Sequence, residues 1–392
     1  MDIKLLNQVE KESIGERQPL PETYLRLSDD EMDARIAAAK QTLGDRLVIL
    51  GHHYQRDEVI KFADYIGDSL KLARAAATRH TAEFVIFCGV HFMAESADIL
   101  RGPHQKIILP DLAAGCSMAD MAAEDQLDVA WRELAEMGVD VSTIVPVTYI
   151  NSSAAIKAFV GRHGGVVCTS TNAAAVMTWA WERKSRVFFF PDQHLGRNTA
   201  FAMGVPLDQM AEWDYRARDL DAMNARCYRP ETRVILWRGF CSVHTKFTLD
   251  QVRDVRAADP TVRVLVHPEC PFDVVQAADL VGSTEFIIDQ VRGAAPGASW
   301  AIGTEVNLVH RLALEHPEQR IASLQKNVCP CATMNRIDPA HLLWALENLA
   351  AGHVVNPVRV PETVKRHARV ALDRMLALKG SGQVGRAAMA KD

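Results

Sequence analysis

The sequence has little of what a membrane or secreted protein needs. It contains no run of about 18 consecutive apolar residues, so we expect no transmembrane helix. Its first residues, MDIKLLNQVEKESIGERQ, include acids and no apolar core, so they do not predict a secretory signal. The net charge is only −5, which argues against nucleic acid or an anionic membrane as the main partner. We therefore expect a cytoplasmic protein.

Several common catalytic patterns are also missing. No GxGxxG pattern lies between a predicted strand and a predicted helix, and GxxxxGK[ST], GxSxG and HExxH do not occur. Rossmann-type dinucleotide binding, P-loop chemistry, serine hydrolysis at a nucleophile elbow and zincin chemistry therefore lose their main support.

Cysteine is too scarce for a disulfide scaffold, since only 8 of the 392 residues are cysteines. In a reducing cytosol they are expected to be thiols, thiolates or metal ligands. No CxxC pair occurs, and the closest pair is Cys329 and Cys331. Spacing alone leaves each cysteine open between a metal ligand and a small buried apolar residue.

Short β-branched runs alternate with helical stretches along most of the chain. This pattern predicts an α/β protein with parallel sheets and helices on both faces. A helix is predicted after Ser28, which can cap it, and Gly44 is expected to end it. The length predicts two to three domains. The predicted strands are residues 46–50, 83–88, 106–110, 142–150, 164–170, 186–191, 233–237, 262–268 and 285–289.

Three segments share one layout, which is a strand, polar residues at its carboxyl end, an amphipathic helix and a Gly/Ser/Thr element. They predict three similar αβα units with parallel sheets, arranged with pseudo-threefold symmetry around a central active site. We call these units the first repeat (1–140, with the N-terminal lead-in and helix), the second repeat (141–260) and the third repeat (261–392, with the C-terminal helices and tail).

The repeats also order the cysteines. Cys116 lies 64 residues after His52 (116 − 52), and Cys331 lies 64 residues after His267 (331 − 267). In the longer second repeat, Cys241 lies 92 residues after Tyr149 (241 − 149). One cysteine per repeat at a late position predicts three thiolates around one pocket.

Polar residues at the strand ends point to the same pocket, because open parallel sheets bind ligands beyond the carboxyl ends of their strands. The motifs HHY (52–54), TYIN (148–151) and HPE (267–269) lie at three such ends. Hydroxyl side chains lie where loops enter helices, a place that binds anions, although each of them can instead be a simple helix cap. These are Ser69, Ser170, Ser283 and Thr284.

Twelve stretches between about residues 49 and 350 together closely resemble the quinolinate synthases. In chain order they are GHHYQ, ADYIGDSL, FCGVHFMAESADIL, PDLAAGCSMAD, VTYINSSAAIKA, VCTSTNA, FFPDQHLGRNTA, GFCSVHTKF, HPECPFDVVQAAD, GSTEFI, AIGTEVNLVHRL and CPCATMNRI. The resemblance implies a [4Fe–4S] cluster with three cysteine ligands and one open iron that acts as a Lewis acid. Its motifs map the ligands to Cys116, Cys241 and Cys331, with Cys329 as the alternative to Cys331.

The resemblance also implies the reaction and the roles of the site residues. Iminoaspartate and dihydroxyacetone phosphate condense to quinolinate, phosphate and water, and an L-aspartate oxidase is the candidate supplier of iminoaspartate. The implied catalytic residues are Glu269, Tyr54, Tyr149 and His244. The implied substrate-binding residues are His52, Ser69, Tyr149, Asn151, Ser170, His267, Glu269, Ser283 and Thr284.

Two other classes compete with this interpretation. An iron–sulfur redox or iron sensor would use Cys329 and Cys331 as its switch, but it does not need the His, Tyr, Glu and Ser residues at the strand ends. A zinc hydrolase with Cys and His ligands would be colourless, whereas a [4Fe–4S] protein is brown.

Overall fold

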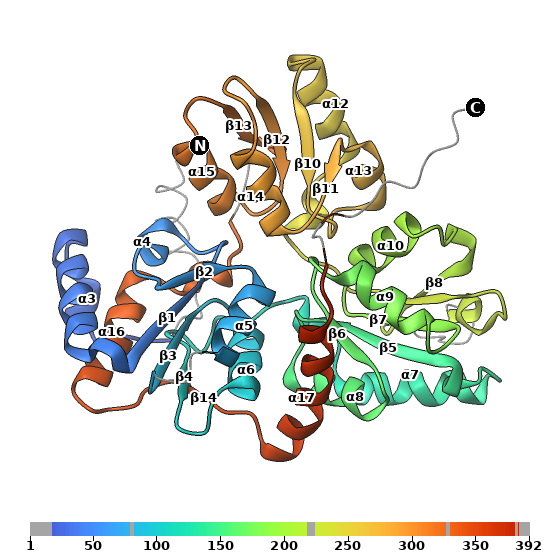
Figure 1. The fold of residues 1–392 in the computed structure, drawn as a ribbon, viewed down its shortest axis with the longest axis horizontal. Coiled ribbons are helices and arrows are strands. Elements are labelled where there is room, and N and C mark those ends of the chain that lie inside the picture. Colours follow the sequence, from blue (N-terminus) through green and yellow to red (C-terminus); the bar gives the residue numbers. More distant parts are fainter. Residues whose placement is uncertain (1–17, 79–81, 218–223, 327–329, 381–382, 384–392) are drawn as a thin grey trace. The chain divides into compact units, whose positions relative to one another are not determined.

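The computed structural model describes residues 18–78, 82–217, 224–326, 330–380 and 383 (Figure 1). Three mostly parallel sheets with interleaved helices make up this part of the chain, which confirms the α/β class. Its internal contacts divide the chain into two compact units, which we describe separately. Unit A comprises Met1–Cys116, Glu305–Arg311 and Asn327–Pro361, and unit B comprises Ser117–Thr304, Leu312–Lys326 and Glu362–Asp392.

Unit A contains a five-stranded sheet of order β14-β4-β3-β1-β2, in which β14 is antiparallel to β4 and the other pairs are parallel. The strands are β1 (Leu47–His52), β2 (Tyr65–Gly67), β3 (Phe84–Cys88), β4 (Lys106–Ile108) and β14 (Pro357–Val358). The helices are α2 (Glu22–Leu25), α3 (Asp29–Leu43), α4 (Asp57–Ile60), α5 (Ser69–Thr78), α6 (His91–Leu100) and α16 (Pro339–Ala350), with the 3-10 turns η1 (Gly44–Arg46) and η7 (Met334–Arg336).

Unit B contains two parallel sheets, of order β6-β5-β7-β9-β8 and β11-β10-β12-β13. The strands are β5 (Ile144–Tyr149), β6 (Val166–Cys168), β7 (Arg186–Phe190), β8 (Met210–Trp213), β9 (Val234–Trp237), β10 (Arg263–Val266), β11 (Leu280–Val281), β12 (Ser299–Gly303) and β13 (Arg320–Ser323). The helices are α7 (Glu124–Glu136), α8 (Ala154–Arg162), α9 (Ala173–Trp181), α10 (Gln193–Ala202), α12 (Leu249–Ala258), α13 (Phe272–Ala277), α14 (Thr284–Arg292) and α17 (Glu362–Ala377).

Short 3-10 turns complete unit B, and one helix crosses the division between the units. The turns are η2 (Ala119–Met121), η3 (Val141–Thr143), η4 (Leu207–Gln209), η5 (Ala225–Tyr228) and η6 (His244–Lys246). The division falls within α15 (Val306–Glu315).

The helix predicted after Ser28 is confirmed as α3. Ser28 and Glu31 form a capping box at its start, and Gly44 ends it with φ +51°, a conformation that glycine adopts at no steric cost. The strand predicted over residues 285–289 is wrong, because this segment lies within α14. The short run EFIID is too brief to separate the two periodicities, and the buried Ile287, Ile288 and Val291 follow the helical one.

The three sheets repeat one strand order. The order β2-β1-β3-β4 in unit A matches β6-β5-β7-β9 and β11-β10-β12-β13 in unit B. Several elements of the first repeat have a counterpart in the third repeat at one constant separation along the chain. His52 and His267 are 215 residues apart (267 − 52), and α6 and α15, β3 and β12, and η2 and η7 begin and end at the same separation. The internal repeat is therefore present in the fold, while the pseudo-threefold arrangement and the boundaries 1–140, 141–260 and 261–392 stay predictions.

The same separation pairs the residues at two helix starts. Asp68 Oδ1 accepts the Lys71 N–H at 2.9 Å at the start of α5, and Ser283 Oγ accepts the Phe286 N–H at 3.3 Å at the start of α14. The structural counterpart of Ser283 is thus Asp68, and that of Thr284 is Ser69.

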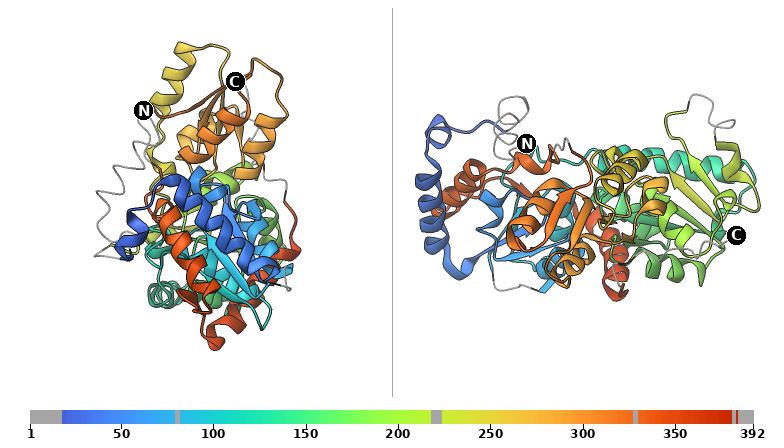
Figure 2. Two further views of the ribbon diagram at one scale, coloured as in Figure 1. Left: turned by 90° about the vertical axis from the view of Figure 1, so that its left-hand side faces the viewer. Right: turned by 90° about the horizontal axis from the view of Figure 1, so that it is seen from above.

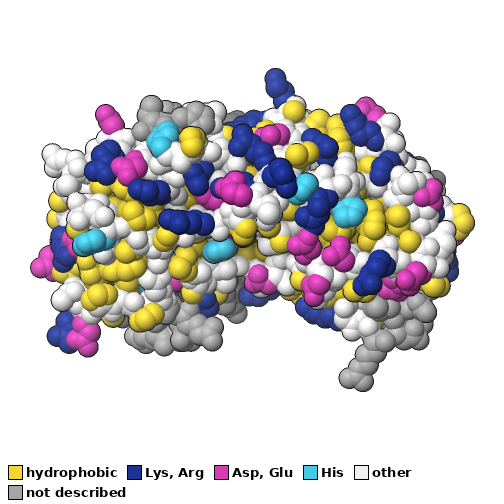
Figure 3. Space-filling view, turned by 90° about the horizontal axis from the view of Figure 1, so that it is seen from below, with side chains coloured by type: hydrophobic (Ala, Val, Ile, Leu, Met, Phe, Trp, Pro, Cys, Tyr) yellow, Lys and Arg dark blue, Asp and Glu magenta, His cyan; other side chains and the backbone are white. Residues whose placement is uncertain are grey.

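The C-terminal helix α17 packs closely against α8 in unit B (Figures 1 and 2). A Cβ atom added at Gly161 would lie 2.0 Å from the His367 carbonyl oxygen, so only glycine permits this approach. On the face shown in Figure 3, basic and acidic side chains are interspersed over the described residues. Among the described residues, no helix is long and apolar enough to cross a membrane.

His341 forms a buried charge cluster in unit A. Its Nδ1 lies 2.8 Å from Asp338 Oδ1, and its Nε2 lies 3.0 Å from the Gln18 carbonyl oxygen and 3.7 Å from Asp111 Oδ2. Burial by itself lowers the pKa of His341, but the hydrogen bond and the charge of Asp338, with smaller contributions from Gln18 and Asp111, raise it. The protonated ring therefore stabilises unit A.

This cluster predicts a pH-dependent stability. Because the folded-state pKa is raised, the stabilisation is fully present below the ordinary value of about 6.5 and is lost as the pH rises through the folded-state pKa. His341→Gln should lower the stability of the metal-free chain by about 1–3 kcal/mol below pH 6 and by less above it. Urea unfolding from pH 5 to 9 measures this, with the exposed His353→Gln as the control. A stability difference that is constant across the pH range would contradict the prediction.

Candidate active site

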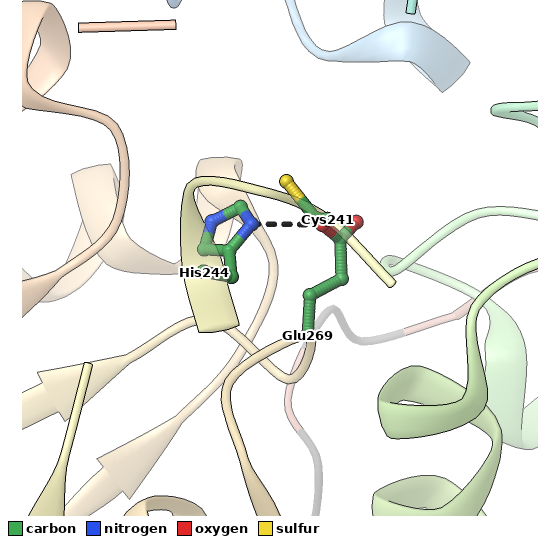
Figure 4. A group of neighbouring side chains, drawn as sticks. All are labelled: Cys241, His244 and Glu269. Atoms are coloured by element: carbon green, nitrogen blue, oxygen red, sulfur yellow. Dashed lines mark ion pairs between the residues drawn. The ribbon is translucent and has the colours of Figure 1, made fainter. Parts of the chain in front are cut away.

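Glu269 is the centre of a buried polar cluster in unit B. It lies three residues after β10, and the residue is 2% exposed. Tyr149, the last residue of β5, donates its hydroxyl to the Glu269 carboxylate, and His244 Nδ1 lies 2.8 Å from Glu269 Oε2 (Figure 4). The carboxyl ends of strands from the two sheets of unit B thus bring Tyr149 and Glu269 together, as expected from the strand-end motifs.

Two histidines fix the orientation of this cluster. The rings of His244 and His267 stack with their centroids 4.5 Å apart. His244 Nε2 lies 3.3 Å from Thr304 Oγ1, and His267 Nδ1 accepts the backbone N–H of Glu269 at 3.4 Å. A neutral His267 with Nδ1 as acceptor carries its proton on Nε2. Both rings are almost completely buried and are held by contacts on more than one side.

The ionisable groups in and beside this cluster have pKa values that shift in different directions. Burial by itself raises the pKa of Glu269, but the neighbouring His244 and His267 and the hydrogen bonds from His244 and Tyr149 lower it below the usual range. Burial lowers the pKa of His267 to about 3, so this ring is neutral at physiological pH. Burial and the charge of Glu269 raise the pKa of Asp192 well above its usual value. Glu269 is therefore the ionised carboxylate of this region.

Cys241 completes a set of side chains that can hold a metal ion. One ligand atom each from Cys241, His244 and Glu269 lie within 4.8 Å of one another (Figure 4). Sulfur, nitrogen and oxygen donors of this kind suit iron and zinc. Cys241 lies in the loop between β9 and η6, where a ligand can approach it.

Exposure divides the described cysteines into two groups. Cys116, Cys241 and Cys331 are partly exposed, whereas the other described cysteines, Cys88, Cys168, Cys227 and Cys270, are buried. Cys329 lies outside the described residues, so the choice between it and Cys331 stays a prediction. The three partly exposed thiols are the ones that a metal can reach.

In unit A, His52 and Tyr54 adopt the same turn as His267 and Glu269. His52 is the last residue of β1, and its Nδ1 accepts the Tyr54 backbone N–H at 3.1 Å. The rings of His52 and Tyr54 lie 4.7 Å apart. The His-x-Tyr and His-x-Glu motifs therefore present the residue two positions after the histidine in the same way.

The predicted hydroxyl residues lie at or near helix starts. Ser69 and Thr284 are the first residues of α5 and α14, and Ser170 lies three residues before α9. Ser283 caps α14, but a hydroxyl that accepts an N–H still has a proton to donate. The capping and anion-binding interpretations of Ser283 are therefore compatible.

Asn151 follows β5 by two residues, and its Oδ1 is buried without a hydrogen-bond partner among the described residues. Buried polar atoms are usually satisfied, so an unsatisfied one beside a candidate site favours a ligand there. Because an amide oxygen accepts, such a ligand would present a donor to it, and the substrate-binding role of Asn151 stays a prediction.

The sequence interpretation missed three polar residues that support the site. Asn198 on α10 donates to the carbonyl oxygens of Pro268 and Cys270 at 2.8 and 2.9 Å, which fixes the turn that carries Glu269. Asp192 and Glu305 are fully buried carboxylates at the starts of α10 and α15. Their signal was a polar residue between a buried strand and a helix, in the stretches FFPDQHLGRNTA and AIGTEVNLVHRL.

The exposure of the cysteines predicts their reactivity in the native, metal-free chain. Burial raises the pKa of Cys88 and of Cys227 to about 12, and it raises that of Cys168 and Cys270 well above the usual value. These thiols should react with iodoacetamide at least about 100-fold more slowly than Cys116 and Cys241, because the thiolate is the nucleophile. Cys331 should be the slowest of the exposed three, because burial of its sulfur raises its pKa.

Timed alkylation at pH 8, followed by mass spectrometry of peptides, measures these rates. Alkylation after urea unfolding is the control, since all thiols should then react alike. Rapid native labelling of Cys168 or Cys270 would contradict the predicted division.

Comparisons with known proteins agree with these features. The model of the family described as "Quinolinate synthetase A protein" matches residues 34–377. The quinolinate synthase of Corynebacterium glutamicum is 56% identical over 362 residues, covering 92% of this chain and 91% of that protein. The quinolinate synthases of a Geobacillus species and of Bacillus subtilis are 55% and 50% identical over 359 residues, each covering 92% of this chain and 96% of the relative. The chain therefore belongs to the quinolinate synthase family.

Proposed function

We propose that the chain condenses iminoaspartate with dihydroxyacetone phosphate to form quinolinate in NAD biosynthesis. Each turnover forms one carbon–carbon and one carbon–nitrogen bond and releases one phosphate and two waters. The observation that carries the proposal is the buried cluster of Glu269, His244 and Tyr149 beside the partly exposed Cys241. Proton transfers between carbon and oxygen need such a group, and a redox or iron sensor does not.

The proposed cofactor is a [4Fe–4S] cluster held by Cys116, Cys241 and Cys331. The donor chemistry fits, since these are the described thiols that are not buried and thiolates are the usual ligands of iron–sulfur clusters. When bound, an iron without a protein ligand supplies Lewis-acid chemistry for substrate oxygen or nitrogen. Cys329 is the alternative to Cys331.

Glu269 is proposed as the general base and acid. Its ionised carboxylate can take a proton from substrate carbon or hydroxyl and return it when water leaves. The Tyr149 hydroxyl and His244 Nδ1 hold the carboxylate in place, and both can share the proton through their hydrogen bonds. In unit A, Tyr54 occupies the corresponding position of its turn and is proposed for the same kind of hydrogen bonding.

The substrates carry carboxylates and a phosphate, and the proposed binding groups are hydrogen-bond donors rather than a basic patch. The neutral His267 presents an N–H from Nε2, and the side-chain amide nitrogen of Asn151 can donate, whereas its unsatisfied Oδ1 is an acceptor. Free N–H groups and hydroxyls at helix starts stabilise anions. These residues are Ser69, Ser170, Ser283 and Thr284, together with His52 on β1.

The proposal is tested by anaerobic reconstitution of the chain with iron and sulfide, followed by an assay with dihydroxyacetone phosphate and freshly generated iminoaspartate. An L-aspartate oxidase can supply iminoaspartate, which is unstable in water. Quinolinate, detected by mass spectrometry, and a brown chain with broad absorption near about 400 nm are expected. Absence of quinolinate from a chain that holds its full iron would contradict the proposed reaction. A colourless zinc protein would contradict the proposed cofactor.

We expect Cys116→Ala, Cys241→Ala and Cys331→Ala each to lose the cluster and the activity, because each removes one of three thiolate ligands. Iron and sulfide per chain and the visible spectrum measure this. Cys227→Ala serves as the control, because Cys227 is buried and its sulfur contacts the Glu212 carbonyl oxygen. Full iron in Cys331→Ala, with loss in Cys329→Ala, would assign the third ligand to Cys329.

We expect Glu269→Gln to retain the cluster and to lower the turnover rate by about 100-fold or more, because an amide cannot act as a general base. The exposed Glu315→Gln in the same unit is the control. Iron content and quinolinate formation are measured on the same samples. A near-normal rate for Glu269→Gln would remove Glu269 from the acid–base role.

A further inference from the structure

Val90, Asp192 and Glu305 occupy the same backbone position in the three repeats. Strand pairing aligns Gly51 with Cys88, Thr148 with Phe190, and Val266 with Gly303. Two residues after Cys88, Phe190 and Gly303 come Val90, Asp192 and Glu305, each directly before a ten-residue helix, which is α6, α10 or α15. The same backbone position thus carries an apolar residue in the first repeat and a buried carboxylate in the other two.

Glu305 uses both carboxylate oxygens within unit A. Its Oε1 accepts the backbone N–H of Cys331 at 3.2 Å and the side-chain N–H of Asn307 at 3.2 Å, and its Oε2 accepts the Asn307 backbone N–H at 2.8 Å. The Leu308 backbone N–H also donates to this carboxylate. Because donors face both oxygens, this position favours a carboxylate over any side chain that carries a donor of its own.

The segment that begins at Glu305 also holds the turn that contains His52 and Tyr54. Asn307 Nδ2 donates to the Tyr54 carbonyl oxygen at 3.1 Å. The Arg311 guanidinium donates to the carbonyl oxygens of His53 and Gln55 at 2.9 and 2.6 Å. One turn of α15 therefore joins the loop of Cys331 to the loop of a predicted catalytic tyrosine.

The first and second repeats show whether a helix start can contact a cysteine loop through the backbone alone. In the first repeat, the His91 N–H donates to the Ala114 carbonyl oxygen, two residues before Cys116, at 2.8 Å. In the second, the Gln193 N–H donates to the Gly239 carbonyl oxygen, two residues before Cys241, at 3.0 Å. This backbone bond is common to the first and second repeats, and in the first repeat Val90 provides no side-chain acceptor beside it.

Asp192 places a carboxyl group beside this bond in the second repeat. It caps α10 by accepting the Leu195 N–H at 2.7 Å, and the backbone N–H of Cys241 faces it closely enough to lower its pKa. Glu305 and Asp192 therefore each lie between a helix start and a cysteine loop, in two different sheets.

We propose that Glu305 is a positioning residue that holds the Cys331 loop in the conformation that binds metal, and that Asp192 is its counterpart for Cys241. The proposal rests on the proposed function only in taking Cys331 as a metal ligand. Without the carboxylate, the Cys331 loop keeps its chain connections but loses the bond that orients the cysteine.

The test compares two thiols of the same unit in the Glu305→Leu variant. Cys331 and Cys116 are alkylated together in the native, metal-free chain, and fragment ions separate Cys331 from Cys329. We expect the ratio of the Cys331 rate to the Cys116 rate to rise by about three- to tenfold, as loss of one hydrogen bond implies. After reconstitution, the rate of iron loss to a chelator should rise by a similar factor.

Asp98→Asn is the matched control, because Asp98 is also a buried carboxylate of unit A and its Oδ2 accepts the Val360 N–H at 2.9 Å. It should leave the ratio of the two rates unchanged. An equal change of the Cys331 and Cys116 alkylation rates in Glu305→Leu would show a merely structural role and overturn the proposal. Unchanged rates would also overturn it.

Amide hydrogen exchange of the wild-type chain provides a measurement that does not depend on the folding of a variant. We expect the Cys331 N–H to be protected as well as the first turn of α15. Exchange at the rate of an open loop would overturn the proposal.

The outcomes also separate this inference from the proposed reaction. A chain that makes no quinolinate, but whose Cys331 rate responds to Glu305→Leu, would refute the reaction and keep the positioning role. An active chain whose Cys331 rate does not respond would do the reverse.

Discussion

A carboxylate that is removed from water must be matched by donors or take up a proton, and the candidate site is arranged around this constraint. Glu269 is buried at the end of β10, and it stays ionised because His244 and Tyr149 face it. The nearby Asp192 is pushed toward its protonated form by burial and by the charge of Glu269. The pKa values of these two buried carboxyl groups of unit B thus shift in opposite directions, because Glu269 faces His244 and Tyr149 whereas Asp192 faces the charge of Glu269.

Because the fold repeats, chemically different side chains occupy equivalent backbone positions. The sheets share a strand order, and the turn after the first strand of each repeat carries His-x-Tyr, Tyr-x-Asn or His-x-Glu at the same backbone positions. The first and second repeats also share the backbone hydrogen bond from the helix start to the cysteine loop, whereas the side chains differ. The fold therefore provides equivalent strand ends, and the chemistry of each end depends on the side chains that it carries.

Much of this organisation could be predicted from the sequence, because it depends on local patterns. Buried parallel strands are continuous apolar runs, and helix α3 has its capping box and terminal glycine in the sequence. The equal spacing from His52 to Cys116 and from His267 to Cys331 corresponds to a constant separation of the elements between them. The segment 285–289 was mistaken for a strand because five residues are too few to distinguish the two periodicities.

The sequence by itself determined the α/β class, the repeat, the candidate thiols and the strand-end motifs, because spacing and residue type carry them. Only the tertiary structure decided which groups meet. Glu269 lies against Tyr149, more than a hundred residues away in the chain, and Asn198 on α10 fixes the turn that carries it. The carboxylates Asp192 and Glu305 reach the cysteine loops in the same way. Contacts between distant segments depend on how sheets and helices pack, and no local pattern records that packing.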